Sequence, residues 1–259
     1  MPRKNKTRKN KKRKTGGGIE SSKHKLAIII PYRNREQNLE IISKFLNIFL
    51  DINKIDNDIF VIEQNDNNSF NRGKLSNIGF DICNNIGIYD YFIFHDVDEL
   101  PIQVDYSYSD VPLTLFSHDP NKFDSKHYGS PTGMHDSRLT TSEFNMGGCI
   151  LFTQDNFEKI NGYSNLYSGW GAEDDDLANR VKHVFQKITR RDGIYFALPH
   201  VKENFTKSFR TGPNIDYKNN IKLLENSVEN MFSDGLNTLS YRISSIDHTP
   251  FYRHYKVNI

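Results

Sequence analysis

The sequence predicts an α/β domain whose central sheet is mostly parallel and flanked by helices. Short, uninterrupted apolar runs at 25–30, 59–62 and 91–94 are typical of strands buried on both faces of a sheet. Between them, the segments 36–50 and 75–82 carry apolar residues every three to four positions, as on one face of a helix. Strands and helices that alternate in this way are typical of a parallel, doubly wound sheet.

End signals define the first two elements. Lys25–Ile30 is an apolar run that Pro31 stops. The helix that follows begins near Glu36, because Asn34 is a suitable N-cap and Gln37 lies three residues after it. We therefore expect a strand, a short polar connection and an amphipathic helix.

The second half of the chain has weaker patterns and completes the same domain. Residues 101–145 and 201–220 have little periodicity, so we expect irregular connections there, the second a long mobile loop. The other elements expected are strands at 148–152 and 194–198, helices at 154–160 (capped by Thr153), 174–186 and 217–231, a turn at 233–235 and terminal strands near 237–246 and 253–258.

The charge of the chain is unevenly distributed. Nine of its 34 Lys and Arg residues lie within residues 1–18, so the rest carries a net charge of −7 although the whole chain has +2. Like charges without apolar residues to bury predict a disordered basic tail and Gly linker over residues 1–24, followed by one domain over residues 25–259. The tail is interpreted either as a solvating segment or as a contact for an anionic partner.

Several classes of protein are excluded by composition. No stretch approaches the roughly 20 apolar residues that cross a bilayer, so we expect no transmembrane segment, and no secretory signal follows the basic start. The two cysteines, Cys83 and Cys149, are too few for a disulfide-stapled scaffold or a cysteine-based zinc site.

Two acidic motifs point to chemistry. Asp96 and Asp98 alternate where the third strand ends, and such hard oxygen ligands suit Mg²⁺ or Mn²⁺, although a D-x-D pattern also occurs at ordinary turns. The four acids of Glu173–Asp176 follow Trp170, the only tryptophan. One or two acids complement a helix start, but four repel one another, and such crowding raises a carboxylate pKa toward that of a general base.

Basic and aromatic residues stand at neighbouring strand ends. Arg33 and Arg35 follow the first strand, and Arg72 opens the second helix, so these side chains could bind phosphate oxygens while Phe70 or Tyr32 stacks on a base. His200 follows another predicted strand and could complete a metal site that the aspartates begin. Each of these residues could equally be structural.

Taken together and in chain order, these motifs resemble the β-1,4-galactosyltransferase family from about residue 26 to residue 259. The matching segments are 29–35, 70–80, 96–98, 147–148, 160–163, 169–176 and 233–237. The resemblance implies a glycosyltransferase A-type nucleotide-sugar-binding fold, with the mostly parallel sheet and flanking helices predicted above. It implies inverting transfer of galactose or N-acetylgalactosamine from a UDP-sugar donor to a sugar or glycan acceptor, forming a β-1,4 linkage with manganese (Mn²⁺) as cofactor.

The resemblance also implies a role for each matching residue. Asp174 is the catalytic base, and Asp98 and His200 are metal ligands. The residues implied to bind the donor are Pro31, Arg33, Arg35, Phe70, Arg72, Val97, Asp98, Gly148 and Trp170. Those implied to bind the acceptor are Trp170, Glu173, Asp174 and Asp175.

The chain departs from the family pattern at two places. Many relatives have a third metal ligand three or two residues before the histidine, where this chain has Ala197 and Leu198, so we expect Asp98, His200, diphosphate oxygens and water to hold the metal. Asn145 stands where a Tyr commonly limits bulk at the second carbon of the donor sugar. Asn145 is therefore a donor-specificity residue that leaves galactose and N-acetylgalactosamine open.

Cellular location is inferred from what the sequence lacks. Animal members of the family are usually Golgi type II membrane proteins with disulfides. Because this sequence has neither an evident anchor nor enough cysteines, we expect a cytoplasmic enzyme. Its high Asn, Lys and Ile content fits an AT-rich genome such as that of a large DNA virus or a protist.

Two interpretations compete with a transferase. A non-catalytic glycan or nucleotide-sugar binder of the same fold predicts loss of the base or of a metal ligand, yet Asp174, Asp98 and His200 are all present. A metal-dependent nuclease or phosphotransferase would use the acidic motifs with the basic tail on nucleic acid. Deletion of residues 1–18 tests this second interpretation. It would weaken the salt-sensitive binding of a nucleic-acid enzyme but should not affect a sugar transferase.

Overall fold

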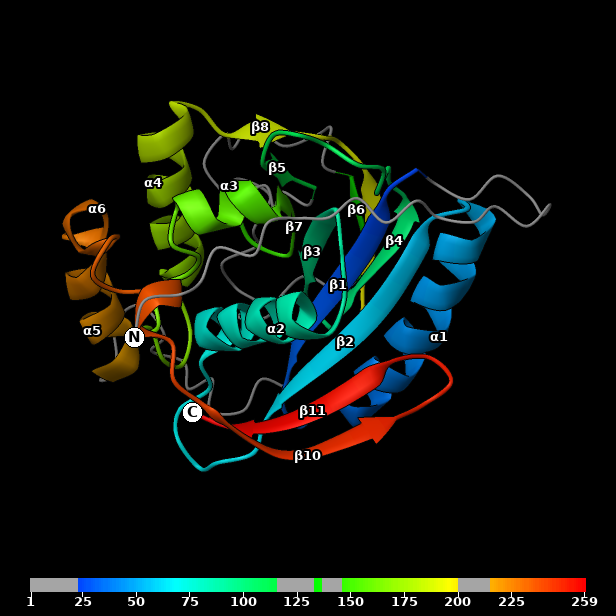
Figure 1. The fold of residues 1–259 in the computed structure, drawn as a ribbon, viewed down its shortest axis with the longest axis horizontal. Helices are drawn as coiled ribbons and strands as arrows, with labels where there is room; N and C mark the ends of the chain where they lie inside the picture. The colour runs from blue at the N-terminus through cyan, green and yellow to red at the C-terminus, as the bar shows by residue number, and fades with distance from the viewer. Residues whose placement is uncertain (1–22, 116–132, 137–145, 200–214) are drawn as a thin grey trace.

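The computed structural model describes residues 23–115, 133–136, 146–199 and 215–259, with only the backbone described at 133–136. Its described strands form an eight-stranded sheet in the order β10-β11-β2-β1-β3-β7-β5-β8 and a three-stranded sheet in the order β4-β9-β6 (Figure 1). The strands are β1 Lys25–Tyr32, β2 Asp56–Gln64, β3 Tyr91–His95, β4 Glu99–Gln103, β5 Leu113–Thr114, β6 Gly133–Asp136, β7 Cys149–Thr153, β8 Thr189–Arg190, β9 Ile194–Ala197, β10 Arg242–His248 and β11 Arg253–Asn258.

Parallel pairing holds the centre of the large sheet together. β1 pairs in parallel with both β2 and β3, and β11 pairs in parallel with the other side of β2. Antiparallel β7 and β10 extend this centre at its two sides. The predicted α/β fold with a mostly parallel central sheet is therefore confirmed.

Helices cover both faces of this sheet. The helices are α1 Glu36–Ile52, α2 Arg72–Ile86, α3 Gln154–Lys159, α4 Glu173–Phe185, α5 Ile215–Leu224, α6 Ser227–Asn230 and the 3-10 turn η2 Leu236–Thr238. Successive residues of β1 point to opposite faces, so Ile28 packs in a core with α1 residues while Ile29 packs in a second core with α2 residues. Side chains on both faces of β1 are fully buried, which explains the uninterrupted apolar run of this strand.

The N-cap of α1 differs from the predicted one because of the backbone conformation before the helix. Asn34 does not cap α1, because the N-cap position is Arg35 and Asn34 has a left-handed φ of 51°. α2 and α3 have side-chain caps: Asn71 accepts from the Lys74 amide, and Thr153 accepts from the Asn156 amide, as predicted for Thr153. Pro31 lies inside β1, which continues to Tyr32 by pairing with β2 alone.

Two segments predicted to be irregular contain regular structure. β4, β5 and β6 occupy parts of 99–136, because their partners β7, β9 and β8 come from distant positions in the chain. The predicted loop 201–220 overlaps α5, and the single helix expected at 217–231 is divided into α5 and α6. Most of the predicted tail and the segment 200–214 lie outside the described residues.

Candidate active site

The carboxyl ends of β1, β2 and β3 meet at one edge of the sheet, as the parallel order requires. The turn at 96–98 leaves β3 there, and the Asp96 amide donates a hydrogen bond of 2.9 Å to the Gly148 carbonyl oxygen just before β7. The antiparallel β3·β7 pairing brings Gly148 to this turn, from more than 50 residues away in the chain. Pro31 and Val97 are buried beside it.

Arg72 connects the two acidic motifs. Its Nε donates to Asp96 Oδ1 at 2.7 Å, and its Nη1 donates to Asp174 Oδ1 at 2.8 Å. Nη1 also donates to the Tyr163 hydroxyl at 3.4 Å. One planar guanidinium thus orients two carboxylates, and its buried Nη2 amino group has no partner among the described residues.

Burial and neighbouring charges together set the pKa of Asp174. Burial raises the pKa of the Asp174 carboxyl well above its usual range; the positive charge of Arg72 opposes this shift, and Glu173 and Asp96 add to it. Burial also raises the pKa of the Glu173 and Asp175 carboxyls. A carboxylate with a raised pKa is a stronger base than an ordinary aspartate, and the Asp174 side chain is 31% exposed, so it remains reachable.

The second aspartate of the turn faces a different arginine. Asp98 Oδ2 lies 3.5 Å from Arg35 Nη1, and the Asp98 side chain is 14% exposed. Its carboxylate oxygens are hard donors of the kind that Mn²⁺ and Mg²⁺ accept. Within the described part of the chain, no three His, Cys, Asp or Glu side chains gather as a complete metal site. His200, the other predicted metal ligand, lies outside it.

A polar cavity of about 470 Å³ opens at the carboxyl end of β2, lined by Arg33, Asn34 and residues 63–69. Arg33 Nη1 donates to the Asn68 carbonyl oxygen at 2.7 Å, and its guanidinium lies 5.3 Å from the centre of the Phe70 ring. The predicted stacking residue Phe70 is therefore next to a basic group and an open cavity. Another cavity, lined by residues 239–242 and 258–259, contains none of the predicted site residues.

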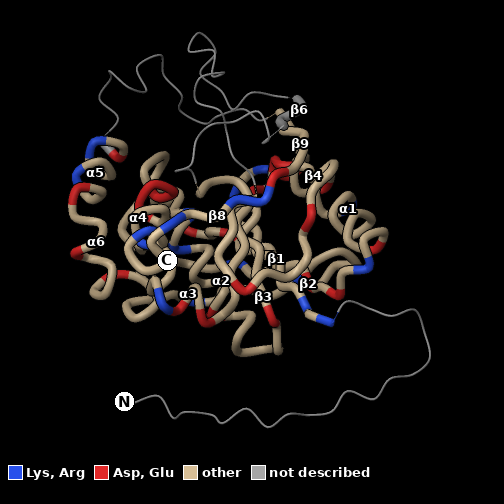
Figure 2. Tube along the Cα trace, turned by 90° about the horizontal axis from the view of Figure 1, so that it is seen from above, with Lys and Arg blue, Asp and Glu red and all other residues tan. Residues whose placement is uncertain are grey.

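The loop that carries Trp170 is held from two directions. The Gly169 amide donates to the Phe70 carbonyl oxygen at 2.8 Å, and Asn220 Nδ2 of α5 donates to the carbonyl oxygens of Ser168 and Gly171, both at 2.9 Å. The Trp170 side chain is 47% exposed, and its ring centre lies 6.0 Å from that of Tyr217. An exposed aromatic ring thus stands next to the acidic start of α4, which Figure 2 shows as a red segment.

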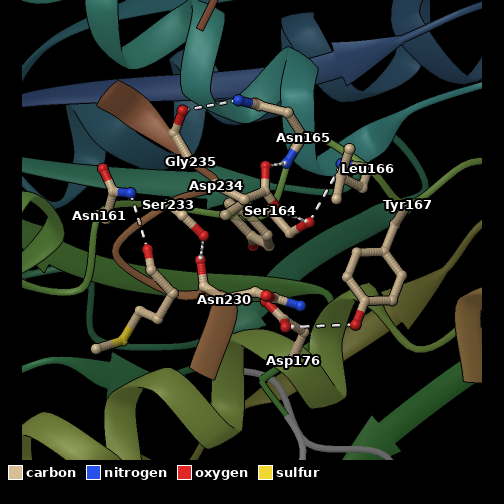
Figure 3. A network of polar contacts seen from close by, with 12 residues as sticks. Asn161, Ser164, Asn165, Leu166, Tyr167, Asp176, Asn230, Ser233, Asp234 and Gly235 are labelled. Carbon is tan, nitrogen blue, oxygen red and sulfur yellow. Dashed lines mark hydrogen bonds between the residues drawn. The ribbon is translucent and has the colours of Figure 1, made fainter. Parts of the chain in front are cut away.

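The four acids at the start of α4 divide into different roles. Asp176 is 2% exposed and accepts from Arg180 Nε at 2.6 Å, while Arg180 Nη1 donates to the Asp234 carbonyl oxygen at 2.9 Å. The Asp234 carboxylate accepts from the Ser164 hydroxyl and from the Asn165 amide (Figure 3). Asp176 is therefore a structural residue that ties α4 to the 233–237 motif.

Replacing Gly235 by Ala is expected to destabilise the fold by about 3 kcal/mol or more. Gly235 has φ 152° and ψ −138°, a region almost restricted to glycine, and a Cβ there would lie 2.0 Å from the Asn161 carbonyl oxygen. Urea unfolding measures the loss. The neighbouring Ser233→Ala, at an exposed position, is the control and should change stability by less than about 0.5 kcal/mol. Equal stabilities would contradict the close packing.

The structure brings three pairs of predicted site residues into contact and reveals partners that the sequence did not indicate. The pairs are Arg35 with Asp98, Arg72 with Asp174, and Arg33 with Phe70. The missed partners are Asp96 and Tyr163, which both contact Arg72. Asp96 was part of the D-x-D signal, but nothing in the sequence distinguished its role from that of Asp98. Asn145, like His200, lies outside the described residues.

Comparison with known families gives two matches. Residues 4–109 match the family model described as the N-terminal region of glycosyl transferase group 7, and residues 136–203 match the one described as the N-terminal domain of galactosyltransferase. The chain is similar to β-1,4-galactosyltransferase 4 of Cricetulus griseus, with 34% identity over 90% of this chain and 63% of the relative. It is 35% identical to human β-1,4-galactosyltransferase 4 over 88% of this chain and 61% of the relative.

Solved structures show the same fold. The catalytic domain of Drosophila β1,4-galactosyltransferase 7 in complex with xylobiose matches with a TM-score of 0.71 and 24% identity, over 91% of this chain and 94% of that one. A mutant of that enzyme in complex with manganese, UDP-Gal and xylobiose matches with a TM-score of 0.68, 24% identity and the same shares of the two chains. The expected glycosyltransferase A-type fold is confirmed.

The prediction of a cytoplasmic enzyme is wrong. The relatives are animal β-1,4-galactosyltransferases, which are Golgi membrane enzymes. Of the helices in the described ranges, none combines the length and the apolar character that crossing a bilayer requires. This chain spans 61–63% of the length of the β-1,4-galactosyltransferase 4 relatives given above.

Proposed function

Since the chain belongs to the β-1,4-galactosyltransferase family, we propose that it moves galactose from UDP-galactose to a sugar hydroxyl, with inversion at the anomeric carbon. The observation that carries this proposal is the pair of hydrogen bonds from Arg72 to Asp96 and Asp174. They place a largely buried cation between the carboxyl end of β3 and the start of α4. This arrangement supports the proposal because a cation there can contact a donor diphosphate while Asp174 contacts an acceptor hydroxyl.

Asp174 is the proposed general base. It takes the proton from the acceptor hydroxyl, whose oxygen attacks the anomeric carbon from the face opposite UDP. Arg72 holds Asp174 Oδ1, so the remaining oxygen Oδ2 can face the hydroxyl. The raised pKa of Asp174 supports this role because it strengthens the carboxylate as a proton acceptor.

The donor is proposed to lie along the carboxyl ends of β1, β2 and β3. The unpartnered Nη2 of Arg72 supports a contact with a diphosphate oxygen, and Arg35 supplies a second cation. The uracil would occupy the polar cavity beside Phe70 and Arg33. Pro31, Val97 and Gly148 line this path as backbone and apolar contacts.

A divalent metal fits the donor chemistry of Asp98, and we propose Mn²⁺, with His200 as its second protein ligand. The relative solved with UDP-Gal also contains manganese. When bound, such an ion would neutralise negative charge that develops on the leaving diphosphate. Arg35, which lies 3.5 Å from Asp98, would add to the same neutralisation.

The acceptor is proposed to lie between Trp170 and the start of α4. An aromatic face next to carboxylates suits a sugar, because the ring packs on C–H groups while carboxylates such as Glu173 and Asp175 accept from hydroxyls. The half-exposed Trp170 ring supports this placement. We propose a β-1,4 linkage from family membership, and we propose that Asn145 sets the choice between galactose and N-acetylgalactosamine.

The test is transfer from a panel of UDP-sugars with Mn²⁺ to free N-acetylglucosamine, glucose and xylose. The expected result is metal-dependent turnover of UDP-galactose, with or without UDP-N-acetylgalactosamine. Binding of UDP-galactose without turnover on any acceptor would instead support a non-catalytic binder. Failure to bind any UDP-sugar would overturn the proposal.

The rate of transfer is expected to fall as the pH is lowered, with a midpoint above about 4, the ordinary pKa of an aspartate. The folded-state pKa of Asp174 is raised, so its base form exists only above that raised value and is lost on acidification through it. A profile of kcat against pH, at saturating donor and metal, measures the midpoint. A rate that stays constant down to the ordinary aspartate range would contradict this role.

A further inference from the structure

Glu99 directly follows the turn that carries Asp96 and Asp98, and it is the first residue of β4. The side chain of Glu99 is buried, with the residue 6% exposed. A carboxylate at such a position is costly unless a cation or hydrogen-bond donors compensate it. The question is therefore which group compensates the buried Glu99 carboxylate.

The described residues provide no compensation for one of its oxygens. Glu99 Oε2 is buried and has no hydrogen-bond partner among them. The acids Asp96 and Asp98 precede Glu99 in the same turn, so the negative charge gathered there accommodates a cation better than another anion.

The strand pairing places Glu99 beside the end of β9, where this chain has Ala197 at a position that carries a metal ligand in many relatives. Glu99 is the register partner of Ala197 in the antiparallel β4·β9 ladder, and the Leu198 amide donates to the Asp98 carbonyl oxygen at 2.7 Å. Side chains of directly opposite residues lie on the same face, with Cβ atoms about 4.5–5.5 Å apart. Ala197 has only a methyl group, so its side chain offers no polar partner to the Glu99 carboxylate.

We propose that Glu99 is a second carboxylate ligand of the divalent cation that Asp98 binds. It acts in place of the side chain that Ala197 lacks. The proposal rests on the metal site of the proposed function and adds a ligand to it. Carboxylate oxygens from adjacent residues at a strand end, one of them unpartnered and buried, are the donor set that Mn²⁺ and Mg²⁺ prefer.

The test is the Mn²⁺ affinity of Glu99→Gln, measured from the electron paramagnetic resonance signal of free Mn²⁺ without any sugar donor. Gln has the same shape and keeps a neutral group in the buried position, but it cannot supply an anionic oxygen. We expect the dissociation constant to rise at least tenfold, in the range that loss of a metal-site contact produces. The matched control Glu158→Gln, at an exposed position on α3, should leave the affinity unchanged.

Two further measurements separate the possible outcomes. Thermal unfolding without metal checks that Glu99→Gln folds, and addition of Mn²⁺ should raise the melting temperature of the wild type more than that of the variant. Asp98→Asn tests the site itself. If Asp98→Asn abolishes Mn²⁺ binding while Glu99→Gln binds like the wild type, Glu99 is not a ligand. If neither substitution changes the affinity, the proposed metal site is wrong as well.

Discussion

Replacing Asp174 by Asn is expected to lower kcat about 10³-fold, within the range that positioned proton transfer contributes. The amide keeps the size of the side chain and an oxygen that can accept from Arg72, but it cannot take the proton of an acceptor hydroxyl. Donor affinity should change little, because the proposed role of Asp174 is on the acceptor hydroxyl. The loss is therefore expected in turnover rather than in the KM for UDP-galactose.

Initial rates at saturating donor and acceptor measure this effect, and calorimetric titration with UDP checks that the donor site is intact. Asp155→Asn is the matched control, because Asp155 is an exposed acid in the first turn of α3, just as Asp174 lies in the first turn of α4. The control should transfer galactose at the wild-type rate. Turnover of Asp174→Asn within a few-fold of the wild type would remove Asp174 from the mechanism.

Replacing Arg72 by Lys is expected to lower kcat/KM by about 10²–10³-fold, comparable to loss of one positioned donor in an electrostatic site. The guanidinium spans Asp96 and Asp174 with separate nitrogen atoms and keeps a third donor unpartnered. An ammonium group is a single point charge on a flexible stem and cannot reproduce this planar arrangement. The substitution therefore affects both the base and the proposed diphosphate contact.

Two readouts identify this combined role. The affinity for UDP should fall, and so should turnover at saturating donor, whereas Asp174→Asn lowers turnover alone. Arg190→Lys is the control, because Arg190 forms an ion pair with Asp192 at 2.6 Å outside the predicted site. If Arg72→Lys retains full activity and UDP affinity, the planar guanidinium of Arg72 is not needed for donor binding or transfer. Thermal unfolding of both variants excludes a folding defect as the cause.

Much of the fold was predictable because its signals are local. The apolar runs of β1 and β3 are long enough to be buried on both faces, and the periodicity of α1 and α2 faces the two cores. Element boundaries were less predictable. The extension of β1 through Pro31 depends on its neighbour β2, and the left-handed φ of Asn34 depends on the path into α1.

The short strands β4, β5, β6 and β8 were missed because they depend on pairing with distant parts of the chain. β5 has only two residues, and it exists because β7 and β8 flank it. Two residues carry too little periodicity to indicate a strand. The start of α5 was likewise included in the predicted loop 201–220 because of its polar composition, although a helix was expected from residue 217 and α5 packs against α4.

The sequence by itself determined which chemical groups the candidate site contains, because the D-x-D motif, the acid run after Trp170 and the arginines after β1 and at the start of α2 are local patterns. Only the tertiary structure decided which acid does what. Asp176 turns inward to Arg180, while Asp174 turns to Arg72, and Glu99 becomes buried opposite Ala197. These roles depend on which distant residue lies within hydrogen-bond reach, and strand order and helix packing set those distances.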